Sequence, residues 1–430
     1  MRLLRVLVVG SGGREHALVS KLARERGVSE VLCAPGNPGI AGIARGVPIP
    51  ATDIEGLIAL IRAENIDLTV VGPEAPLEKG LVDRCTAEGL AAFGPTRQAA
   101  RLETSKAFAK DLMQRAQVPT ARYRIASTPA DARAAVSDFH GRVALKADGL
   151  AAGKGVIVAT SHADAEAAID ALMVQRTVGD AGSTLVVEEL LEGPEVSFFV
   201  LCDGTHARPL GSAQDHKRVN DGDEGPNTGG MGAFAPSPLM DDALQARVMQ
   251  TVVEPVLKTM AADGHPYRGF LYVGLMLTSN GPKVIEFNVR FGDPEAQVVL
   301  PMIESDLAPL LHAAATGADF SQAPLRMSTE PHVGVVLASR GYPEQPETGK
   351  VINGLDAAAT LDDVLIFHAG TSRSGNDIVS SGGRVLTVVG RGATYETAIA
   401  RAYAAVDRIA FDGVHVRRDI GQKALHALKR

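Results

Sequence analysis

The hydrophobic and polar positions of the first hundred residues alternate between strand and helix patterns. Residues 4–9 form a continuous apolar run, and residues 15–24 then carry apolar side chains at helical spacing. Helices are also predicted after Asp53 and over residues 77–88, and further apolar runs lie at residues 30–34, 68–71 and 90–93. This alternation predicts a parallel sheet with helices on both faces, so we expect an α/β domain over residues 1–103.

The pattern changes after residue 104 and becomes mixed. A helix is predicted over residues 106–114, and two strands, at residues 142–146 and 156–159, flank a glycine-rich turn. Alternating or apolar runs of strand length follow at residues 185–189, 195–202, 269–277 and 283–288. The antiparallel character of these runs predicts a second, α+β domain over residues 104–325.

A predicted linker separates this domain from the C-terminal part of the chain. Residues 316–331 contain Pro324 and Pro331, a composition typical of a linker. A predicted helix over residues 395–409 follows a set of short strands at residues 333–339, 349–352, 364–368 and 384–389. We therefore expect a small C-terminal α+β domain over residues 331–430.

Composition and charge narrow the class of protein. Of the 430 residues, 45% are hydrophobic and 22% are charged, which is typical of soluble globular proteins with several domains. The net charge of −7 provides no basic field for a nucleic-acid partner. The first apolar run has only the length of a strand, so we expect neither a membrane span nor a signal peptide, and a cytoplasmic location. Cys33, Cys85 and Cys202 have no CxxC spacing and are predicted to be buried thiols.

The turn at residues 10–16 follows a strand and opens a helix. Its glycines, the helix N-terminus and Arg14 favour an anion such as phosphate, although a tight turn that binds nothing remains the alternative. The turn partly matches a dinucleotide fingerprint, but Glu15 replaces the third glycine and residues 34–37 supply no ribose-binding acid. A nicotinamide-dependent oxidoreductase is therefore disfavoured.

A second glycine-rich segment occupies residues 146–156. Its glycines can fold backbone amides over a phosphate chain, and Lys146 can supply charge at its start. The Walker pattern fails because Gly155 follows Lys154 and because the loop joins two strands. Taken alone, the segment could equally be a flexible surface hairpin.

A predicted strand near residue 286 carries polar groups on one face. Strand alternation places Glu286, Asn288 and Arg290 on the same side. The two oxygen ligands suit Mg²⁺ held with substrate phosphates, and the arginine can balance a transferring phosphoryl group. A merely solvated polar face is the alternative reading.

Residues 215–218 precede a further glycine-rich run at residues 225–232. Such a backbone is costly in entropy unless close approach is needed, so a binding loop is more plausible than a spacer. The chain has no GxSxG elbow, no HExxH pattern and no paired CxxC, which leaves serine hydrolysis and structural zinc without support.

Several longer runs are spread over the whole chain: GSGGREHAL, APGNPG, VGPEAPL, KADGLAAGKGV, QDHKR, GPNTGGMGA, VIEFNVRFGDPE and FHAGT. Together they resemble the glycinamide ribonucleotide synthetase family of the ATP-grasp superfamily. The glycine loop and the Glu-x-Asn pair alone would indicate only the wider class, which includes biotin carboxylases. The combination of GPNTGGMGA with RFGDPE is more specific.

This resemblance implies a fold and a reaction. The fold would combine an N-terminal domain (residues 1–103), an ATP-grasp domain (104–325) whose lobe at about residues 120–190 moves as a lid, and a C-terminal domain (331–430). The reaction would be ATP-dependent ligation of glycine to 5-phosphoribosylamine through glycyl phosphate, in purine biosynthesis, by a monomer using Mg²⁺ or Mn²⁺. Another ATP-grasp carboxylate-amine ligase is the closest alternative. A non-catalytic nucleotide-binding regulator would lack groups that this chain retains: Lys146, Glu286, Asn288 and Arg290.

The resemblance also implies roles for individual residues. The ATP site would comprise Lys106, Lys146, Gly153, Lys154, Gly155, Glu188, Leu191 and Glu195. The metal ligands would be Glu286 and Asn288, and the catalytic groups around glycine and its activated carboxylate would be Asp215, Lys217 and Arg290. The phosphoribosylamine site would comprise Gly12, Gly13, Arg14, Glu15, Pro35, Gly36, Asn37, Gly229 and Gly230. Residues 270–277 lack the extra metal carboxylate of many ATP-grasp enzymes, so water and phosphate oxygens would complete the metal shell.

Overall fold

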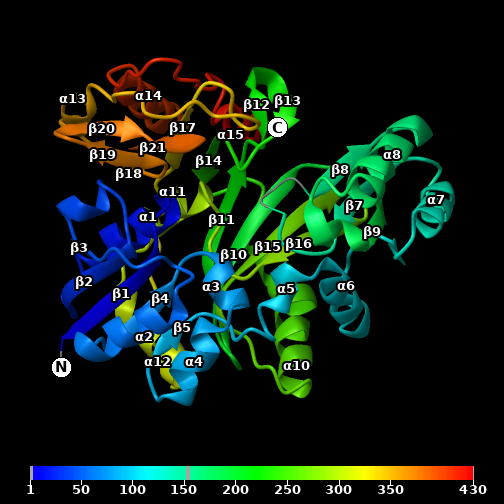
Figure 1. Ribbon diagram of the computed structural model, residues 1–430, viewed down its shortest axis with the longest axis horizontal. Coiled ribbons are helices and arrows are strands. Elements are labelled where there is room, and N and C mark those ends of the chain that lie inside the picture. The colour runs from blue at the N-terminus through cyan, green and yellow to red at the C-terminus, as the bar shows by residue number, and fades with distance from the viewer. Residues whose placement is uncertain (1–2, 152–154, 430) are drawn as a thin grey trace.

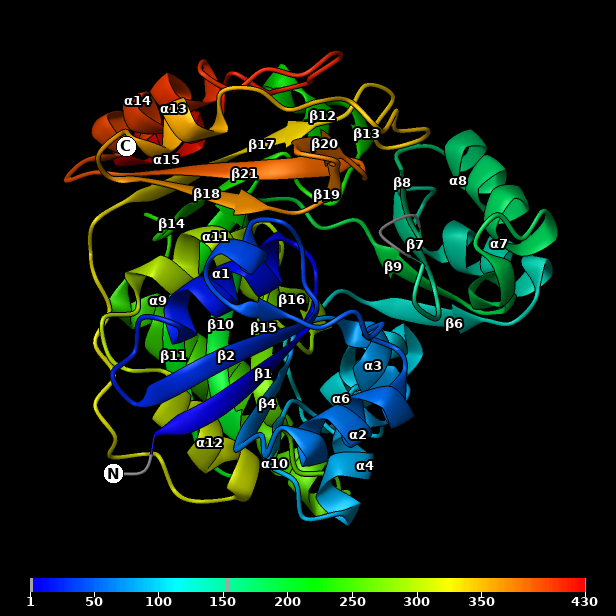
Figure 2. The same ribbon diagram turned by 60° about the vertical axis from the view of Figure 1, so that its left-hand side comes forward.

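The structure is a computed structural model that describes residues 3–151 and 155–429. Figure 1 shows the N-terminal domain at the lower left, the C-terminal domain above it, and a lobe that projects to the right of the central domain. Figure 2, turned by 60°, shows the same lobe standing apart from the body of the molecule. The architecture confirms the predicted combination of α/β and α+β domains.

The N-terminal domain is built on a parallel sheet with strand order β3-β2-β1-β4-β5. Val6, Leu7 and Val8 in the central strand are fully buried, because helices and other domains cover both faces of the sheet. Helix α1 (Gly13–Leu22) begins directly after β1 and so directs its N-terminus to the carboxyl edge of the sheet. The strands are β1 (Leu4–Gly10), β2 (Val28–Pro35), β3 (Arg45–Gly46), β4 (Leu68–Val71) and β5 (Ala92–Phe93).

The helix predicted over residues 77–88 is divided in two. Gly80 adopts a left-handed backbone conformation with φ of +80°, which ends one helix and starts the next. The prediction was wrong because the apolar pattern continues across this glycine, although the glycine itself was a visible signal. The remaining helices of the domain are α2 (Ile54–Ala63), α3 (Glu74–Glu78) and α4 (Leu81–Ala87).

The projecting lobe has its own sheet, with strand order β6-β9-β7-β8, and its own hydrophobic core. That core includes Leu145, Ile169 and Val187 and is separate from the cores of the other domains. A lobe with a separate core can move as a unit relative to the body. Its elements are β6 (Tyr123–Ala126), α7 (Pro129–Asp138), β7 (Val143–Ala147), β8 (Val156–Ala159), α8 (His162–Ile169) and β9 (Leu185–Glu189).

The central domain contains an antiparallel sheet that continues into the C-terminal domain, with strand order β16-β15-β10-β11-β14-β17-β21-β18. Its strands are β10 (Glu195–Asp203), β11 (Ala207–Asp215), β14 (Gly232–Ala235), β15 (Arg268–Thr278) and β16 (Gly281–Asn288), with a separate hairpin of β12 (Arg218–Asn220) and β13 (Glu224–Asn227). Its helices are α5 (Arg101–Thr104), α6 (Lys106–Arg115), α9 (Asp242–Val248), α10 (Glu254–Ala262), α11 (Glu295–Val299) and α12 (Ala308–Thr316).

The C-terminal domain joins that sheet through antiparallel pairing of β14 with β17, from Gly232 opposite Val335 to Ala235 opposite His332. The sequence suggested a separate unit, whereas the structure has one sheet running through both domains. The strand predicted at residues 349–352 does not form and leaves only a single bridge. The elements are β17 (His332–Ala338), α13 (Leu355–Ala359), β18 (Val364–His368), β19 (Thr371–Ser374), β20 (Asp377–Ser380), β21 (Arg384–Arg391), α14 (Tyr395–Val406) and α15 (Gln422–Leu428).

The N-terminal domain shares its hydrophobic cores with the central sheet. Leu7 lies in the same buried cluster as Phe198, and Val6 lies in the same cluster as Phe199. Adjacent residues of β1 and of β10 therefore contribute to two different cores, as strand alternation requires. The N-terminal and central domains form one packed body, against which the lobe is set.

Candidate active site

A cleft with a volume of about 240 Å³ lies between the lobe, the central sheet and the N-terminal domain. It brings together predicted residues from distant parts of the chain, namely Lys106, Lys146, Gly155, Glu188, Asp215, Lys217, Gly229, Glu286, Asn288 and Arg290. Two further residues predicted for ATP, Gly153 and Lys154, lie outside the described residues. The other predicted residues are not part of its described lining: Gly12, Gly13, Arg14, Glu15, Pro35, Gly36, Asn37, Leu191, Glu195 and Gly230.

The glycine-rich loop is tied to the helix that carries Lys106. This lysine is the first residue of α6, and its Nζ lies 3.4 Å from the carbonyl oxygen of Gly149. The Asp148 carboxylate accepts a hydrogen bond of 3.2 Å from the backbone N–H of Ala107. The loop therefore starts at the N-terminus of α6, where a bound phosphate would meet both the lysine and the helix dipole.

Two buried lysines enclose one buried carboxylate in the cleft. Glu188 Oε1 lies 2.9 Å from Lys146 Nζ, and its Oε2 lies 3.0 Å from Lys110 Nζ. Burial lowers the pKa of Lys110 to about 8, a change that the Glu188 charge opposes and the Lys146 charge reinforces. Lys110 was missed from the sequence. It lies four residues after Lys106, so the helical spacing that puts both ammonium groups on one face could have found it.

The predicted metal ligands lie at the end of β16. Glu286 forms no ion pair within the described chain, and although burial acts to raise the pKa of its carboxyl, the charges of Lys217 and Lys146 hold it below its usual value. Hydrogen bonding assigns the amide nitrogen of Asn288 to the side facing Glu103 Oε1, 3.2 Å away, which turns its Oδ1 away from that carboxylate. An ionised carboxylate and an amide oxygen suit a hard divalent cation.

Arg290 is fixed in place by two acids from the N-terminal half of the chain. Its Nη2 donates to Glu103 Oε1 at 2.7 Å, and its Nε donates to Glu74 Oε2 at 3.2 Å. Burial acts to lower the pKa of Arg290, but Glu103 and Glu74 raise it overall, so the guanidinium stays charged. The sequence did not single out either acid, because pairs separated by about two hundred residues leave no local pattern.

The segment after β11 places two of its side chains at the cleft and one in the core. Lys217 Nζ lies 2.6 Å from Glu195 Oε2, so the acid predicted for ribose is engaged by this lysine. Asp215 is the last residue of β11 and lines the cleft beside Lys217. His216 is fully buried and packs edge-on against Phe234, with ring centroids 5.9 Å apart. Alternation along the extended chain explains why neighbouring residues face opposite sides.

A further buried carboxylate, Glu295, lines the same cleft. It is the first residue of α11, and Ser197 Oγ donates a hydrogen bond of 3.2 Å to its Oε1. Burial and the Asp215 charge raise the pKa of Glu295 to about 7. Glu295 was missed from the sequence, because nothing in its local pattern distinguishes a buried acid from an exposed one.

The first glycine-rich turn is occupied by its own acid. Glu15 Oε2 accepts a hydrogen bond of 2.6 Å from the backbone N–H of Gly12, and its Oε1 lies 2.6 Å from Arg14 Nε. Arg14 also donates to the carbonyl oxygen of Phe291 at 3.3 Å. The Glu15 carboxylate thus caps the start of α1, and Arg14 links the turn to the central domain. Because Glu15 already occupies the turn, a bound anion would lie next to it and not within it.

The second N-terminal loop contacts the C-terminal domain. Asn37 Nδ2 donates to the carbonyl oxygens of Ser11, at 2.8 Å, and His368, at 2.9 Å. Asn37 Oδ1 accepts the backbone N–H groups of Gly39 and Ile40. One asparagine therefore holds together the two loops predicted for phosphoribosylamine and the end of β18.

The C-terminal domain also reaches the cleft through Arg384 on β21. Its Nη1 donates to the carbonyl oxygens of Gly229 and Asp293, each at 2.6 Å. The hydroxyl oxygen of Tyr342 accepts a hydrogen bond of 2.9 Å from the backbone N–H of Gly229. This domain therefore positions two loops of the cleft wall, a role that no sequence pattern indicated.

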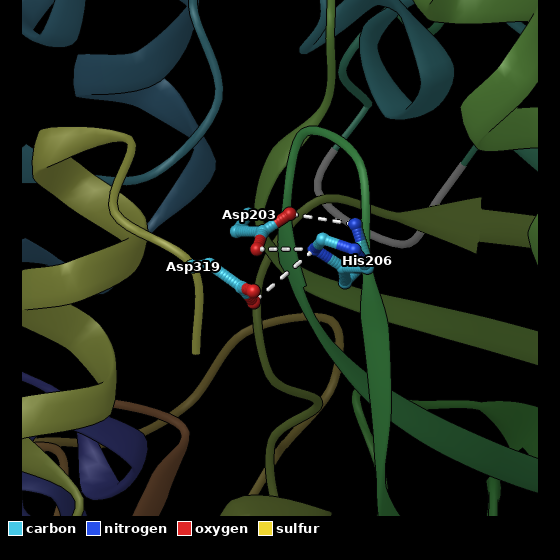
Figure 3. A group of neighbouring side chains, drawn as sticks. All are labelled: Asp203, His206 and Asp319. Atoms are coloured by element: carbon cyan, nitrogen blue, oxygen red, sulfur yellow. Dashed lines mark hydrogen bonds and ion pairs between the residues drawn. The ribbon is translucent and has the colours of Figure 1, made fainter. Parts of the chain in front are cut away.

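Another group of ionisable side chains lies at the opposite end of β10 and β11. Figure 3 shows His206 Nδ1 facing Asp203, 3.1 Å away, and Asp319, 3.5 Å away. Asp203 Oδ1 already accepts the backbone N–H groups of Thr205 and His206, as in a turn stabilised by an aspartate. Two of the three side chains are exposed, and the hydrogen bonds among these residues account for their arrangement.

Among the helices of the described chain, none combines the length and the apolar character that a membrane crossing requires.

Family models match the chain in three consecutive parts. Residues 4–103 match "Phosphoribosylglycinamide synthetase, N domain", residues 104–296 match "Phosphoribosylglycinamide synthetase, ATP-grasp (A) domain", and residues 332–423 match "Phosphoribosylglycinamide synthetase, C domain". Together these matches cover most of the sequence.

Curated relatives and solved structures agree with these matches. The chain is 50% identical over 429 residues to a phosphoribosylamine–glycine ligase of Xylella fastidiosa, with 98% of each chain covered. It is 49% identical over 422 residues to one of Mesorhizobium japonicum, with 98% of this chain and 99% of the relative covered. The crystal structure of phosphoribosylamine–glycine ligase from Thermotoga maritima superimposes with a TM-score of 0.85 at 34% identity, covering 97% and 100% of the two chains. A biotin carboxylase from Campylobacter jejuni, 17% identical with a TM-score of 0.73 over 98% and 95% of the chains, shares the fold.

Proposed function

The chain belongs to the phosphoribosylglycinamide synthetase family, and from this premise we propose how its cleft carries out the family's reaction. It is a ligase of the ATP-grasp class that joins glycine to 5-phosphoribosylamine at the expense of ATP, in purine biosynthesis. The products are glycinamide ribonucleotide, ADP and phosphate. The observation that carries the proposal is the meeting in one cleft of Lys106, Lys146, the Glu286 carboxylate, the Asn288 amide and the fixed Arg290.

ATP would bind between the lobe and the central sheet. Lys106 and Lys146 both line the cleft beside the start of the glycine-rich loop, where they can neutralise phosphate charge. The N-terminus of α6 offers backbone N–H groups to the same phosphates. Glu188, Leu191 and the neighbouring β9 backbone would hold the adenine, and Glu195 would contact the ribose when Lys217 releases it.

A divalent cation fits the end of β16. The Glu286 carboxylate and the Asn288 amide oxygen would hold it, and the ion would supply charge neutralisation for the transferring phosphoryl group. We propose Mg²⁺ or Mn²⁺, because both accept oxygen ligands and both keep positions for phosphate oxygens and water.

The residues around Arg290 would act on glycine and its activated form. Lys217 and Arg290 would orient the glycine carboxylate for attack on the terminal phosphoryl group of ATP, giving glycyl phosphate. The loops at Gly12 to Glu15, at Pro35 to Asn37 and at Gly229 to Gly230 would then present the amine of phosphoribosylamine. Closure of the lobe would exclude water, which would otherwise hydrolyse the acyl phosphate.

We further propose that the protein acts as a monomer in the cytoplasm. The described cleft is lined by residues from the lobe, the central domain and the N-terminal domain of one chain, which supports the proposal of a monomer. Size-exclusion chromatography coupled to light scattering at assay concentration tests the oligomeric state directly.

One assay tests the proposed function. ADP release is measured with ATP, Mg²⁺, glycine and 5-phosphoribosylamine, and each component is then omitted in turn. We expect full release only with both substrates present. Another ATP-grasp carboxylate-amine ligase would instead respond to a different acid, so other small amino acids in place of glycine provide the specificity control. ADP release that does not depend on glycine would refute the assignment.

A further inference from the structure

Glu295 is a buried acid in the cleft that forms no ion pair in the described part of the chain, although the charges of Lys217 and Arg290 act to lower its pKa. It is 4% exposed. Other acids of the cleft wall form ion pairs: Glu188 with Lys110 and Lys146, Glu103 and Glu74 with Arg290, and Asp293 with Arg384. A buried carboxylate without an ion pair is costly and calls for a functional reason.

Neutral groups hold the Glu295 carboxylate in place. Ser197 Oγ donates to its Oε1 at 3.2 Å and lies 3.0 Å from the hydroxyl oxygen of Tyr272. A side chain at position 292 would clash with it, because a Cβ on Gly292 would lie 2.4 Å from Glu295 Oε2. The glycine therefore makes room for the carboxylate, and the serine fixes its orientation without neutralising it.

The charged groups that face Glu295 come from three elements. Asp215 ends β11 and Lys217 follows it, Arg290 follows β16, and the Tyr272 hydroxyl comes from β15. Burial and the Asp215 charge raise the pKa of Glu295 to about 7, while burial keeps the Tyr272 phenol protonated by raising its pKa well above the usual value. The carboxylate can therefore both take up and release a proton near neutral pH.

We propose that Glu295 is the general base that accepts the proton lost by the amine of phosphoribosylamine as the amide forms. The proposal rests on the proposed function. The amine nitrogen donates its lone pair to the carbonyl carbon of glycyl phosphate, the bond from that carbon to the phosphate oxygen breaks, and phosphate leaves with the electron pair. One N–H proton moves to the Glu295 carboxylate and from there to solvent.

The other carboxylates of the cleft suit this task less well. The positive groups around Glu286 hold its pKa below the usual value, which makes it a poor proton acceptor and a good cation ligand. Asp215 is the counter-charge that keeps the pKa of Lys217 high despite burial. Glu295 combines burial, an orientation fixed by Ser197 and the absence of an ion pair in the described chain.

The test separates activation of glycine from attack by the amine. The variant Glu295→Gln keeps the shape of the side chain but cannot accept a proton. We expect kcat for amide formation with phosphoribosylamine to fall about 100-fold or more, the range of a lost general base. With hydroxylamine in place of phosphoribosylamine, glycine hydroxamate should form at the wild-type rate, because this strong nucleophile attacks an acyl phosphate without a base. In the wild type, kcat for amide formation should fall as pH falls through about 7, and this limb should be absent in the variant.

Glu304→Gln changes an exposed acid outside the cleft and should leave every rate unchanged. Equal loss of hydroxamate and amide in Glu295→Gln, or a defect confined to KM for glycine, would show that the acid binds glycine and would overturn the proposal. If Glu295→Gln fails to fold, Glu295→Asp takes its place. This variant should have a lower kcat that still falls at acidic pH, and a kcat independent of pH would contradict the proposal. Failure of the wild type to release ADP with glycine would refute the proposed function instead.

Discussion

The backbone N–H of His368, at the end of β18, donates a hydrogen bond of 2.8 Å to Nδ1 of His16 in α1. The two rings lie 5.7 Å apart, and a Cβ on Gly39 would lie 2.5 Å from each of them. This contact joins the first helix of the chain to the C-terminal domain. It requires an unprotonated Nδ1 on His16, so the junction between the domains depends on a neutral imidazole.

Replacing His16 by asparagine should reduce the acid sensitivity of the protein. Burial, helped by His368, lowers the pKa of His16 to about 3, whereas the unfolded chain has the ordinary value of about 6.5. Because the unfolded state binds the proton more tightly, the stabilisation is complete above pH 6.5 and is lost as pH falls toward 3. The asparagine side chain can still accept the His368 N–H but does not titrate. Between pH 7.5 and 5, the free energy of unfolding of the wild type should decrease by about 1 to 2 kcal/mol more than that of His16→Asn.

Urea denaturation followed by circular dichroism at the two pH values measures this difference. The exposed His426 offers a matched control, since His426→Asn should leave the pH dependence as it is in the wild type. An identical pH dependence in wild type and His16→Asn would show that His16 takes up no proton on unfolding.

Replacing Glu188 by glutamine should destabilise the lobe strongly. The substitution keeps the volume but leaves Lys110 and Lys146 buried without their shared carboxylate. Removing one partner of a buried ion pair typically costs about 3 to 5 kcal/mol. Glu192→Gln is the control, because Glu192 forms an exposed pair with Arg142 whose loss should cost less than about 1 kcal/mol. Equal free energies of unfolding for both variants would contradict the buried triad.

The sequence predicted those parts of the fold and site that depend on local pattern. The buried run of β1 and the hairpin around the glycine-rich loop follow from apolar runs bounded by glycines. Glu286 and Asn288 follow from strand alternation. The continuation of the central sheet through β14 and β17 could not be predicted, since antiparallel pairing of segments about a hundred residues apart leaves no mark in either.

Site residues whose partners lie far away in the sequence were missed for the same reason. Glu103 is an acid at the end of a short helix, and its function appears only when the fold brings it 2.7 Å from Arg290. Arg384 looks like the start of an ordinary strand until β21 places it beside Gly229. Lys110 differs, because its helical spacing from Lys106 was visible and could have been used.

Replacing Arg384 by alanine should impair use of the amine substrate. Its guanidinium holds the carbonyl oxygens of Gly229 and Asp293, which belong to two loops of the cleft wall. Hydrogen bonds from charged donors contribute about 1.5 to 3 kcal/mol each, so kcat/KM for phosphoribosylamine should fall about 10-fold or more. KM for ATP should stay unchanged because Lys106 and Lys146, the lysines proposed to bind ATP, are not touched.

Steady-state kinetics with each substrate varied in turn provide the measurement. Arg408→Ala is a suitable control in the same domain, since the Arg408 side chain donates to Ala357 and Thr360 at the surface, next to α13. A rise in KM for ATP equal to the loss for phosphoribosylamine would mean that Arg384 supports the whole cleft and not these two loops.

The oxygen atoms of glycine should report the order of the chemical steps. A carboxylate is a poor electrophile, so an amide can form at neutral pH only after one carboxylate oxygen has become part of a leaving group. If glycyl phosphate forms beside Arg290 and the metal site, that oxygen must depart with the phosphate. Glycine labelled with ¹⁸O in both carboxylate oxygens should therefore transfer one label to phosphate in each turnover, as measured by mass spectrometry of the phosphate. Activation of the ribose by ATP would leave the phosphate unlabelled while product accumulated, and that result would reject the acyl phosphate route even for a chain of this family.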